Sequence, residues 1–131
     1  MSSESQKIKI LVVFNDLQSV DSNFDPDIIS EIAVRDEAAA VYTALNNCGY
    51  VAEMLPLLNI DQVLIKINSF QPDVIFNLCE GWQSRTDQEM NVAGLWEMLD
   101  LPYTGNSPLT LGLAQNKVLS KNIFKAIGIP T

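Results

Sequence analysis

A group of residues that could bind a ligand lies directly after a continuous apolar run. Residues 77–81 (NLCEG) place an amide, a carboxylate and a glycine within a short stretch. The Glu80 carboxylate could orient an ammonium group or a backbone amide of a ligand, and Gly81 would permit close approach to the backbone. Alternatively, Asn77 and Glu80 only hydrogen-bond the N–H groups of the following loop. The pattern therefore predicts either a site for an amino group or an anchor for the loop.

Basic side chains farther along the chain could bind an anion. Arg85 precedes a predicted helix and could hold a carboxylate or phosphate through two parallel hydrogen bonds, although a solvent-exposed arginine is the commoner outcome. Lys117 and Lys121 share one helical face, and either could reach a phosphate or belong to a solvated surface pair. Residues 103–108 (YTGNSP) form a turn that contains neither GxxxxGK(S/T) nor GxGxxG, so a structural turn is expected there.

Several kinds of chemistry are excluded by composition. The sequence has no histidine, which excludes histidine acid–base catalysis and histidine metal ligation within this chain. Cys48 and Cys79 are the only cysteines; they are too few for a disulfide scaffold and lack metal-ligand spacing. Both are therefore predicted to be small buried apolar residues, and no metal site is predicted.

The charge of the chain excludes two classes of partner. Sixteen acidic and 8 basic residues give a formal net charge of -8. Phosphate backbones are bound by clustered Lys and Arg, so no nucleic-acid partner is expected, and anionic lipid would repel this surface. No apolar segment resembles a secretory signal or is long enough to cross a bilayer. We therefore expect a cytoplasmic protein, and 131 residues suit one domain.

The elements that must position these residues alternate between strands and helices. Continuous apolar runs indicate buried strands, and apolar residues recurring at three and four indicate helices. Strands are predicted at residues 8–14, 50–55, 74–78 and, briefly, 102–104, and helices at 31–48, 59–69, 88–99 and 107–127, the last bent near Asn116. This order predicts an α/β fold, a Rossmann-like doubly wound parallel sheet of about four strands with helices on both faces.

Ligands of such sheets bind beyond the carboxyl ends of the strands, where strand order reverses. Asn15 and Asp16 follow the first predicted strand, and Glu80 and Gly81 follow the third. These four residues are the predicted substrate-binding set. The loop from Asp16 to Ser30 is long, and the sequence leaves open whether it becomes ordered on binding.

The second half of the chain resembles the D-alanine–D-alanine ligase family. The resemblance lies in residues 73–81 (DVIFNLCEG) and in the sequence from residue 91 onward. The YTGNS turn matches the family's YTGS turn, Asn116-Lys117 matches its Asp-Lys pair, and the final GIPT matches the exit to its next domain. Residues before Asp73 fit the family only in topology.

The resemblance implies a reaction and a domain organisation. In this family ATP phosphorylates a carboxylate, and an amine attacks the acyl phosphate to form an amide or peptide bond. Magnesium ions and an ATP-grasp fold hold the nucleotide between two further domains. Residues 1–131 would be a single N-terminal pre-ATP-grasp domain, without the ATP-grasp domains expected after Thr131. This domain contributes part of the amino-acid site and one lysine that reaches the nucleotide phosphates, a position that Lys117 matches. ATP and Mg²⁺ would belong to the full-length enzyme, and the chain alone would be inactive and bind neither.

Two departures from the family pattern bear on the substrate. The family's glycine-rich turn with Ser and Glu is replaced by residues 15–19 (NDLQS), and its His-Gly pair by Glu80-Gly81. A carboxylate at position 80 can still bind an ammonium, so the substrate is expected to be amino-acid-like without being assigned as D-alanine. The expected partner is an ATP-grasp domain, in cis or in trans, with a homodimer also possible. The alternative hypothesis is a stand-alone small-molecule-binding or dimerisation module derived from this domain.

Overall fold

The computed structural model describes residues 7–16 and 26–131 of the chain, with the side chains of residues 26–33 excepted. Within these ranges strands and helices follow one another in the predicted order. The elements are β1 (Lys9–Phe14), α1 (Pro26–Asn47), β2 (Val51–Pro56), α2 (Ile60–Phe70), β3 (Val74–Leu78), the 3₁₀ turn η1 (Thr86–Gln88), α3 (Glu89–Met98), α4 (Pro108–Gln115) and α5 (Lys117–Ala126).

Within the described part of the chain, the sheet has three parallel strands in the order β2-β1-β3. Val12 of the central strand pairs with Met54 on one side and Phe76 on the other. Because β1 is covered by a neighbour on each side and by helices on both faces, it is apolar along most of its length.

The predicted fourth strand is a single bridge instead. Ile75 pairs with Tyr103, where Ile75 N donates to Pro102 O at 2.8 Å and Thr104 N donates to Ile75 O at 3.0 Å. The segment then turns at Gly105, whose φ of 114° is left-handed, and this turn ends the pairing after one residue. The prediction of about four strands was therefore too high by this one element.

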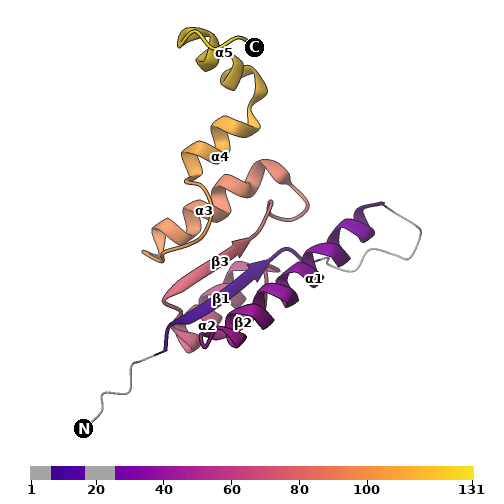
Figure 1. Ribbon diagram of the computed structural model, residues 1–131, viewed down its shortest axis with the longest axis vertical. Coiled ribbons are helices and arrows are strands. Elements are labelled where there is room, and N and C mark those ends of the chain that lie inside the picture. Colours follow the sequence, from indigo (N-terminus) through magenta and orange to yellow (C-terminus); the bar gives the residue numbers. More distant parts are fainter. Residues whose placement is uncertain (1–6, 17–25) are drawn as a thin grey trace.

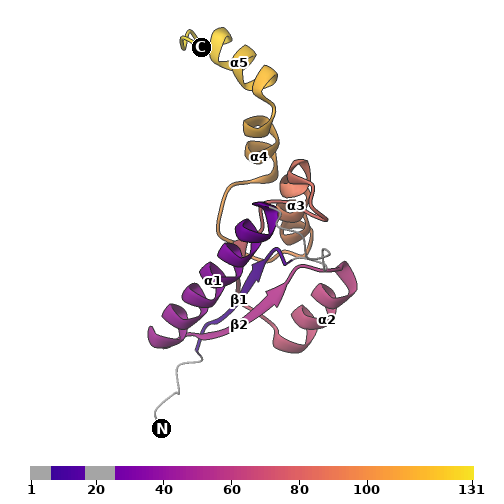
Figure 2. The same ribbon diagram turned by 90° about the vertical axis from the view of Figure 1, so that its right-hand side faces the viewer.

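Helices cover both faces of the sheet (Figures 1 and 2). On one face α1 packs through Ala38 against Val12 and Phe14. On the other face α2 and α3 bury Val63 and Trp96 among residues such as Leu11, Val13 and Ile75. The alternation of side chains along β1 thus supplies two separate cores. The predicted doubly wound arrangement is confirmed.

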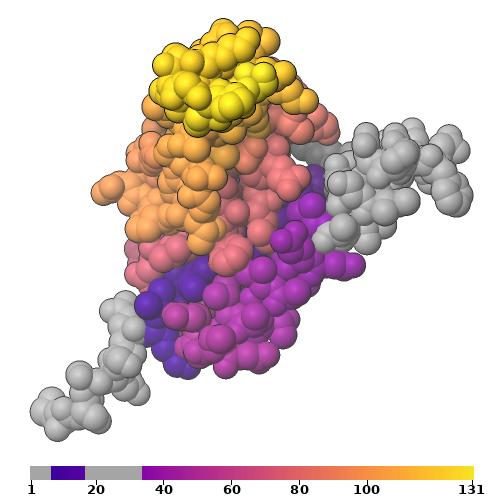
Figure 3. Space-filling view, turned by 45° about the horizontal axis from the view of Figure 1, so that its top comes forward, coloured from indigo at the N-terminus to yellow at the C-terminus, as the bar shows by residue number. Residues whose placement is uncertain are grey.

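The last two helices extend away from the sheet. Helix α4 packs on α3, where the absence of a side chain at Gly112 makes room for Met90; an added Cβ would lie 2.8 Å from Met90 Sδ. Gln115 Nε2 donates to Thr86 O at 2.9 Å and to Glu89 Oε2 at 2.6 Å, which joins the end of α4 to the start of α3. Helix α5 continues beyond α4 and lies at the end of the molecule farthest from the strands (Figure 3).

The predicted bend at Asn116 is confirmed. Asn116 adopts extended backbone angles between the two helices, and its Oδ1 accepts a hydrogen bond from Leu119 N at 3.0 Å. The side chain therefore caps α5 where α4 ends. Asn59 likewise caps α2 by accepting from Gln62 N at 2.9 Å.

Some local predictions were wrong. Helix α1 begins at Pro26 rather than residue 31, which shortens the predicted loop; residues 17–25 of that loop lie outside the described residues. Cys48 is exposed rather than buried, because it follows the last turn of α1 and faces away from the core.

Among the helices that the structure describes, none is long and apolar enough to span a bilayer.

Candidate functional site

The carboxyl ends of β1 and β3 lie side by side and bring the predicted residues together. Phe14 pairs with Leu78, so the residues that follow each strand emerge at the same edge of the sheet. Asn15 Oδ1 accepts a hydrogen bond from Glu80 N at 2.8 Å, and Asn15 Nδ2 donates to Gly81 O at 3.0 Å. We call these two hydrogen bonds the Asn15 bridge. Asp16 follows at this edge and is half-buried.

The loop after Glu80 closes on itself in a tight turn. Trp82 N donates to Arg85 O at 3.1 Å, and Arg85 N donates to Trp82 O at 3.0 Å. Between them Gln83 and Ser84 have φ values of 49° and 59°, the paired left-handed angles of a type I′ turn. A Cβ on Gly81 would lie 2.4 Å from Arg85 O, so the backbone of this turn already requires glycine there.

Asn77 faces α3 instead of the open edge. Its Oδ1 accepts from the indole Nε1 of Trp96 at 3.2 Å, and its backbone N donates to Thr104 Oγ1 at 3.0 Å. Trp96 is fully buried, and a buried indole N–H needs an acceptor. Asn77 thus anchors the structure beneath the loop. The sequence does not predict Trp96 and Thr104 as the partners of Asn77. The one signal for Trp96 is that a tryptophan on an apolar stripe carries an N–H donor that needs an acceptor.

Glu80 offers an unengaged carboxylate at this edge. The residue is exposed, and no other residue that the structure describes forms a hydrogen bond or ion pair with its carboxylate. Its backbone is held by the Asn15 bridge while its side chain remains available to a ligand. This arrangement combines the two roles that the sequence left open, because the loop is anchored and the carboxylate is still exposed.

Arg85 is already paired. Its Nε and Nη2 donate to the two carboxylate oxygens of Asp87 at 3.2 and 2.7 Å, and both side chains are exposed. The hydrogen bonds from Arg85 lower the pKa of the Asp87 carboxyl, and the same pair raises the pKa of Arg85. A ligand anion would compete with Asp87 for these two donors. The carboxylate also makes no cap for α3, whose first residue follows η1.

Cys79 lies between the strand and the loop with its thiol in the core. Burial raises the pKa of this thiol to about 12. Cys79 therefore stays protonated at neutral pH and is unsuited to act as a nucleophile. It anchors the loop through packing, as the sequence predicted for a small buried apolar residue.

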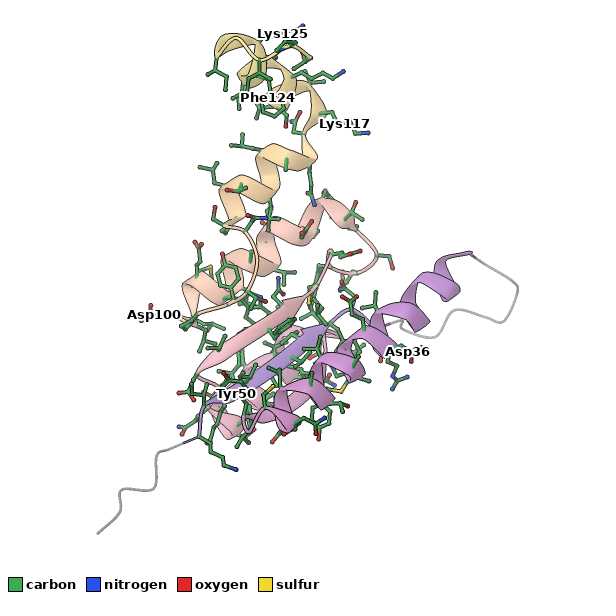
Figure 4. All side chains as sticks on the ribbon, in the orientation of Figure 1. Asp36, Tyr50, Asp100, Lys117, Phe124 and Lys125 are labelled. Atoms are coloured by element: carbon green, nitrogen blue, oxygen red, sulfur yellow. The ribbon has the colours of Figure 1, made fainter. Side chains whose placement is uncertain are left out.

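Lys117 lies on a different element from Glu80, at the first position of α5. Figure 4 shows it where α4 meets α5, well away from the strands. The Lys117 ammonium is exposed and has no ion pair or hydrogen bond with the described part of the chain. The structure therefore brings Asn15, Glu80 and Gly81 together and places Lys117 at the start of α5, without a hydrogen bond to any of the three.

Two other features offer no stronger site. A shallow hollow at the opposite end of β1 and β3 includes Lys9 and Asp73, but Lys9 N already donates to Asp73 Oδ2 at 2.7 Å, and Lys9 Nζ donates to Phe70 O at 3.2 Å. Among the described side chains, those of residues 7–16 and 34–131, no group of three or more Cys, Asp or Glu is arranged to hold a metal ion.

Sequence comparison identifies relatives of this chain. The chain is 32% identical over 106 residues to a D-alanine–D-alanine ligase of Moorella thermoacetica, a match that covers 81% of this chain and 32% of that ligase. It is 39% identical over 102 residues to the D-alanine–D-alanine ligase of Desulforamulus reducens, covering 77% of this chain and 31% of that protein. This chain is a homologue of the D-alanine–D-alanine ligases. The resemblance identified from the sequence is thereby confirmed.

The fold agrees with that of a solved ligase. The crystal structure of D-alanine–D-alanine ligase from Bacillus anthracis complexed with ATP superposes with a TM-score of 0.67 at 22% identity, covering 97% of this chain and 37% of that one. The chain spans close to a third of the length of the ligases it matches. No protein-family model matches the chain.

Proposed function

We propose that this chain is the N-terminal, substrate-side domain of an ATP-dependent carboxylate–amine ligase and acts with an ATP-grasp part, in cis or in trans. The observation that carries the proposal is the unengaged Glu80 carboxylate at the carboxyl edge of the sheet, beside the Asn15 bridge. This is the edge at which doubly wound sheets bind ligands. The homology to D-alanine–D-alanine ligases supports the reaction class.

In this proposal Glu80 binds the ammonium group of an amino-acid-like substrate. A carboxylate accepts charge-assisted hydrogen bonds from an ammonium. Binding is most favourable when the carboxylate has no partner within the protein that the ligand must first displace. Glu80 has no such partner in the described structure, whereas Arg85 has Asp87. Asp16 adds a second acidic residue at the same edge. Both charges favour a cationic group over a carboxylate at this position.

Lys117 would contact a nucleotide phosphate. It is the first residue of α5, so its ammonium lies at a helix N-terminus, where negative charge is favoured. Its lack of an internal partner fits that role. ATP would supply the phosphoryl group that activates the substrate carboxylate. We assign Mg²⁺ to no residue of this chain, since the described residues lack a group of acidic side chains arranged to hold it.

Helix α5 would supply the contact with the ATP-grasp part. Its side chains lie on a helix that projects from the body, and Figure 4 shows Phe124 on it far from the sheet. The large apolar side chains that α5 and the residue after it leave exposed are Val118, Leu119, Ile123, Phe124 and Ile127. Exposed apolar groups gathered on one short helix are typical of an interaction surface.

Phosphoryl transfer needs several preorganised charges around the nucleotide, and we expect residues 1–131 alone to be inactive.

A chimeric ligase tests the proposal. In it, this chain replaces the matching residues of the Moorella thermoacetica ligase, and ATP turnover is measured with a panel of D- and L-amino acids. Glu80→Gln should raise the KM for the amino acid about ten- to hundredfold, because a hydrogen bond to a charged group contributes about 1.5–3 kcal/mol. The KM for ATP should stay within about twofold.

Matched variants control for folding and for charge. Glu37→Gln removes one exposed carboxylate from α1 and should change neither constant. Lys117→Ala should raise the KM for ATP, while Lys121→Ala, one turn farther along α5, should not. A folded chimera with no amino-acid-dependent turnover, or equal losses for both substrates in Glu80→Gln, would refute the assignment.

A second candidate is a binding or dimerisation module without ligase activity, and the same exposed face of α5 favours it. Sedimentation of residues 1–131 tests whether the domain dimerises through this face. A stable dimer that Phe124→Ser abolishes would support this alternative, and a monomer would count against dimerisation.

A further inference from the structure

The side-chain amide of Asn15 hydrogen-bonds the backbone of the loop that carries Glu80. The amide oxygen accepts from the backbone N–H of Glu80 at 2.8 Å, and the amide nitrogen donates to the carbonyl of Gly81 at 3.0 Å. These partners lie 65 and 66 residues away in the sequence. The bridge therefore joins the end of β1 to the first residues after β3, beyond the last pair of the strand ladder, Phe14 and Leu78.

The loop beyond this attachment is stiff within itself. The reciprocal hydrogen bonds of Trp82 and Arg85 close its turn, and Gln88 N donates to Arg85 O at 3.2 Å. The contact of Gly81 with the Arg85 carbonyl leaves little free space inside it. A unit of this kind moves as a whole, so its attachments to the sheet determine where the Glu80 carboxylate stands. These attachments include the buried Cys79, Trp82 packed against the same core, and the Asn15 bridge.

We propose that Asn15 is a positioning residue, which holds the Glu80 backbone so that the carboxylate meets the substrate ammonium in a preset place. The inference rests on the proposed function of Glu80. It differs from a direct substrate contact by Asn15, because the two hydrogen bonds of the bridge direct the Asn15 amide at the loop backbone. A carboxylate that is already held in place binds the ammonium without the entropic cost of ordering the loop. Asn15 contributes to affinity by removing that cost.

A double-mutant cycle in the chimeric ligase separates the two roles. Asn15→Ala should raise the KM for the amino acid about tenfold in the parent protein, as expected when a group loses its hydrogen-bonded support. In the Glu80→Gln background the same substitution should change that KM less than about twofold, because residues that act through one another are not additive. The KM for ATP should not move in either background.

Amide hydrogen exchange on residues 1–131 reports the bridge itself. Asn15→Ala should speed exchange of the Glu80 amide about tenfold, since that N–H loses its acceptor. Asn15→Asp keeps the acceptor for Glu80 N and loses the donor to Gly81 O. It should therefore retain most of the protection at Glu80 and show a smaller change in KM.

Asn46 provides a matched control. Its Nδ2 donates to Tyr42 O at 2.9 Å and its Oδ1 accepts from Ala52 N at 3.3 Å, so it makes the same two kinds of bond near the start of β2. Asn46→Ala should leave both the exchange of Glu80 and the KM for the amino acid unchanged.

The outcomes are distinct. Additive effects of Asn15→Ala and Glu80→Gln on KM would overturn the positioning role in favour of direct contact. Unchanged exchange at Glu80 in Asn15→Ala would overturn the bridge. If Glu80→Gln alone leaves the KM unchanged, or the folded chimera has no turnover, the proposed function fails and the positioning role fails with it. The exchange result then still tells whether the bridge exists.

Discussion

Replacing Gly81 with alanine tests the geometry of the loop after β3 most directly. The new Cβ would stand 2.4 Å from Arg85 O, 2.9 Å from Arg85 C and 3.1 Å from Thr86 Cα. All three are backbone atoms, so no side chain can rotate away to make room. The first distance is closer by about 1 Å than the 3.4 Å at which ordinary contact begins. The turn must therefore open.

The loss of stability follows from the interactions that are broken when the turn opens. Overpacking costs about 1–3 kcal/mol, and each of the two hydrogen bonds between Trp82 and Arg85 contributes about 0.5–1.5 kcal/mol. With partial relaxation of the turn, Gly81→Ala should lower the free energy of unfolding by about 2–4 kcal/mol. For a urea slope of about 2 kcal/mol/M, the midpoint should fall by about 1–2 M.

Two other glycines calibrate the measurement. A Cβ on Gly94 of α3 would meet only Pro108 Cγ at 3.9 Å, which is ordinary contact. Gly94→Ala should therefore stabilise the protein by about 0.5–1 kcal/mol, the usual helix preference of alanine over glycine. Gly112→Ala meets the flexible end of Met90, and its effect should lie between the other two. A Gly81→Ala midpoint equal to that of the parent would refute the geometry of the turn.

Three further predictions concern buried groups. In the native state a thiol reagent should modify the exposed Cys48 and leave Cys79 unmodified until urea unfolds the chain; rapid reaction of both would contradict the burial of Cys79. Because the pKa of Cys79 is raised from its ordinary 9.0 to about 12, its contribution to stability is present below pH 9 and should be lost as the pH rises from about 9 towards 12. Trp96→Phe should lower the free energy of unfolding by about 1–3 kcal/mol, because Asn77 Oδ1 loses its buried donor. Trp82→Phe is the control, since its half-buried indole makes no hydrogen bond within the described residues, and equal losses in the two variants would refute the role of the Asn77 contact.

The positions of most strands and helices could be predicted because their signals are local. Val74–Leu78 is an apolar run bounded by Pro72-Asp73 and a polar segment, and it forms β3 with the predicted bounds. The bend predicted near Asn116 is likewise present, because an asparagine side chain can accept a hydrogen bond from the backbone N–H three residues on and so begin a new helix. The prediction for residues 102–104 was wrong because a strand depends on a neighbour in space, and Gly105 turns the chain away after one pair.

By itself, the sequence determined the fold class and the homology to D-alanine–D-alanine ligases. Periodicity and motif order are properties of consecutive residues, and folding does not alter them. It also marked Asn15, Glu80 and Gly81 as candidates, because each follows a predicted strand or precedes a loop. Residue type alone did not indicate which of them anchors the loop, which offers a carboxylate to a ligand and which allows the tight turn.

Only the tertiary structure decided those tasks. The parallel pairing of β1 with β3 brings Asn15 against a backbone segment 65 residues away, where its amide serves the loop and leaves the Glu80 carboxylate open. Packing against Arg85 explains why position 81 is glycine, and the bend at Asn116 makes Lys117 the first residue of a separate helix, α5. The physical reason is that hydrogen-bond partners and steric contacts depend on distance in space, which the order of residues along the chain does not specify.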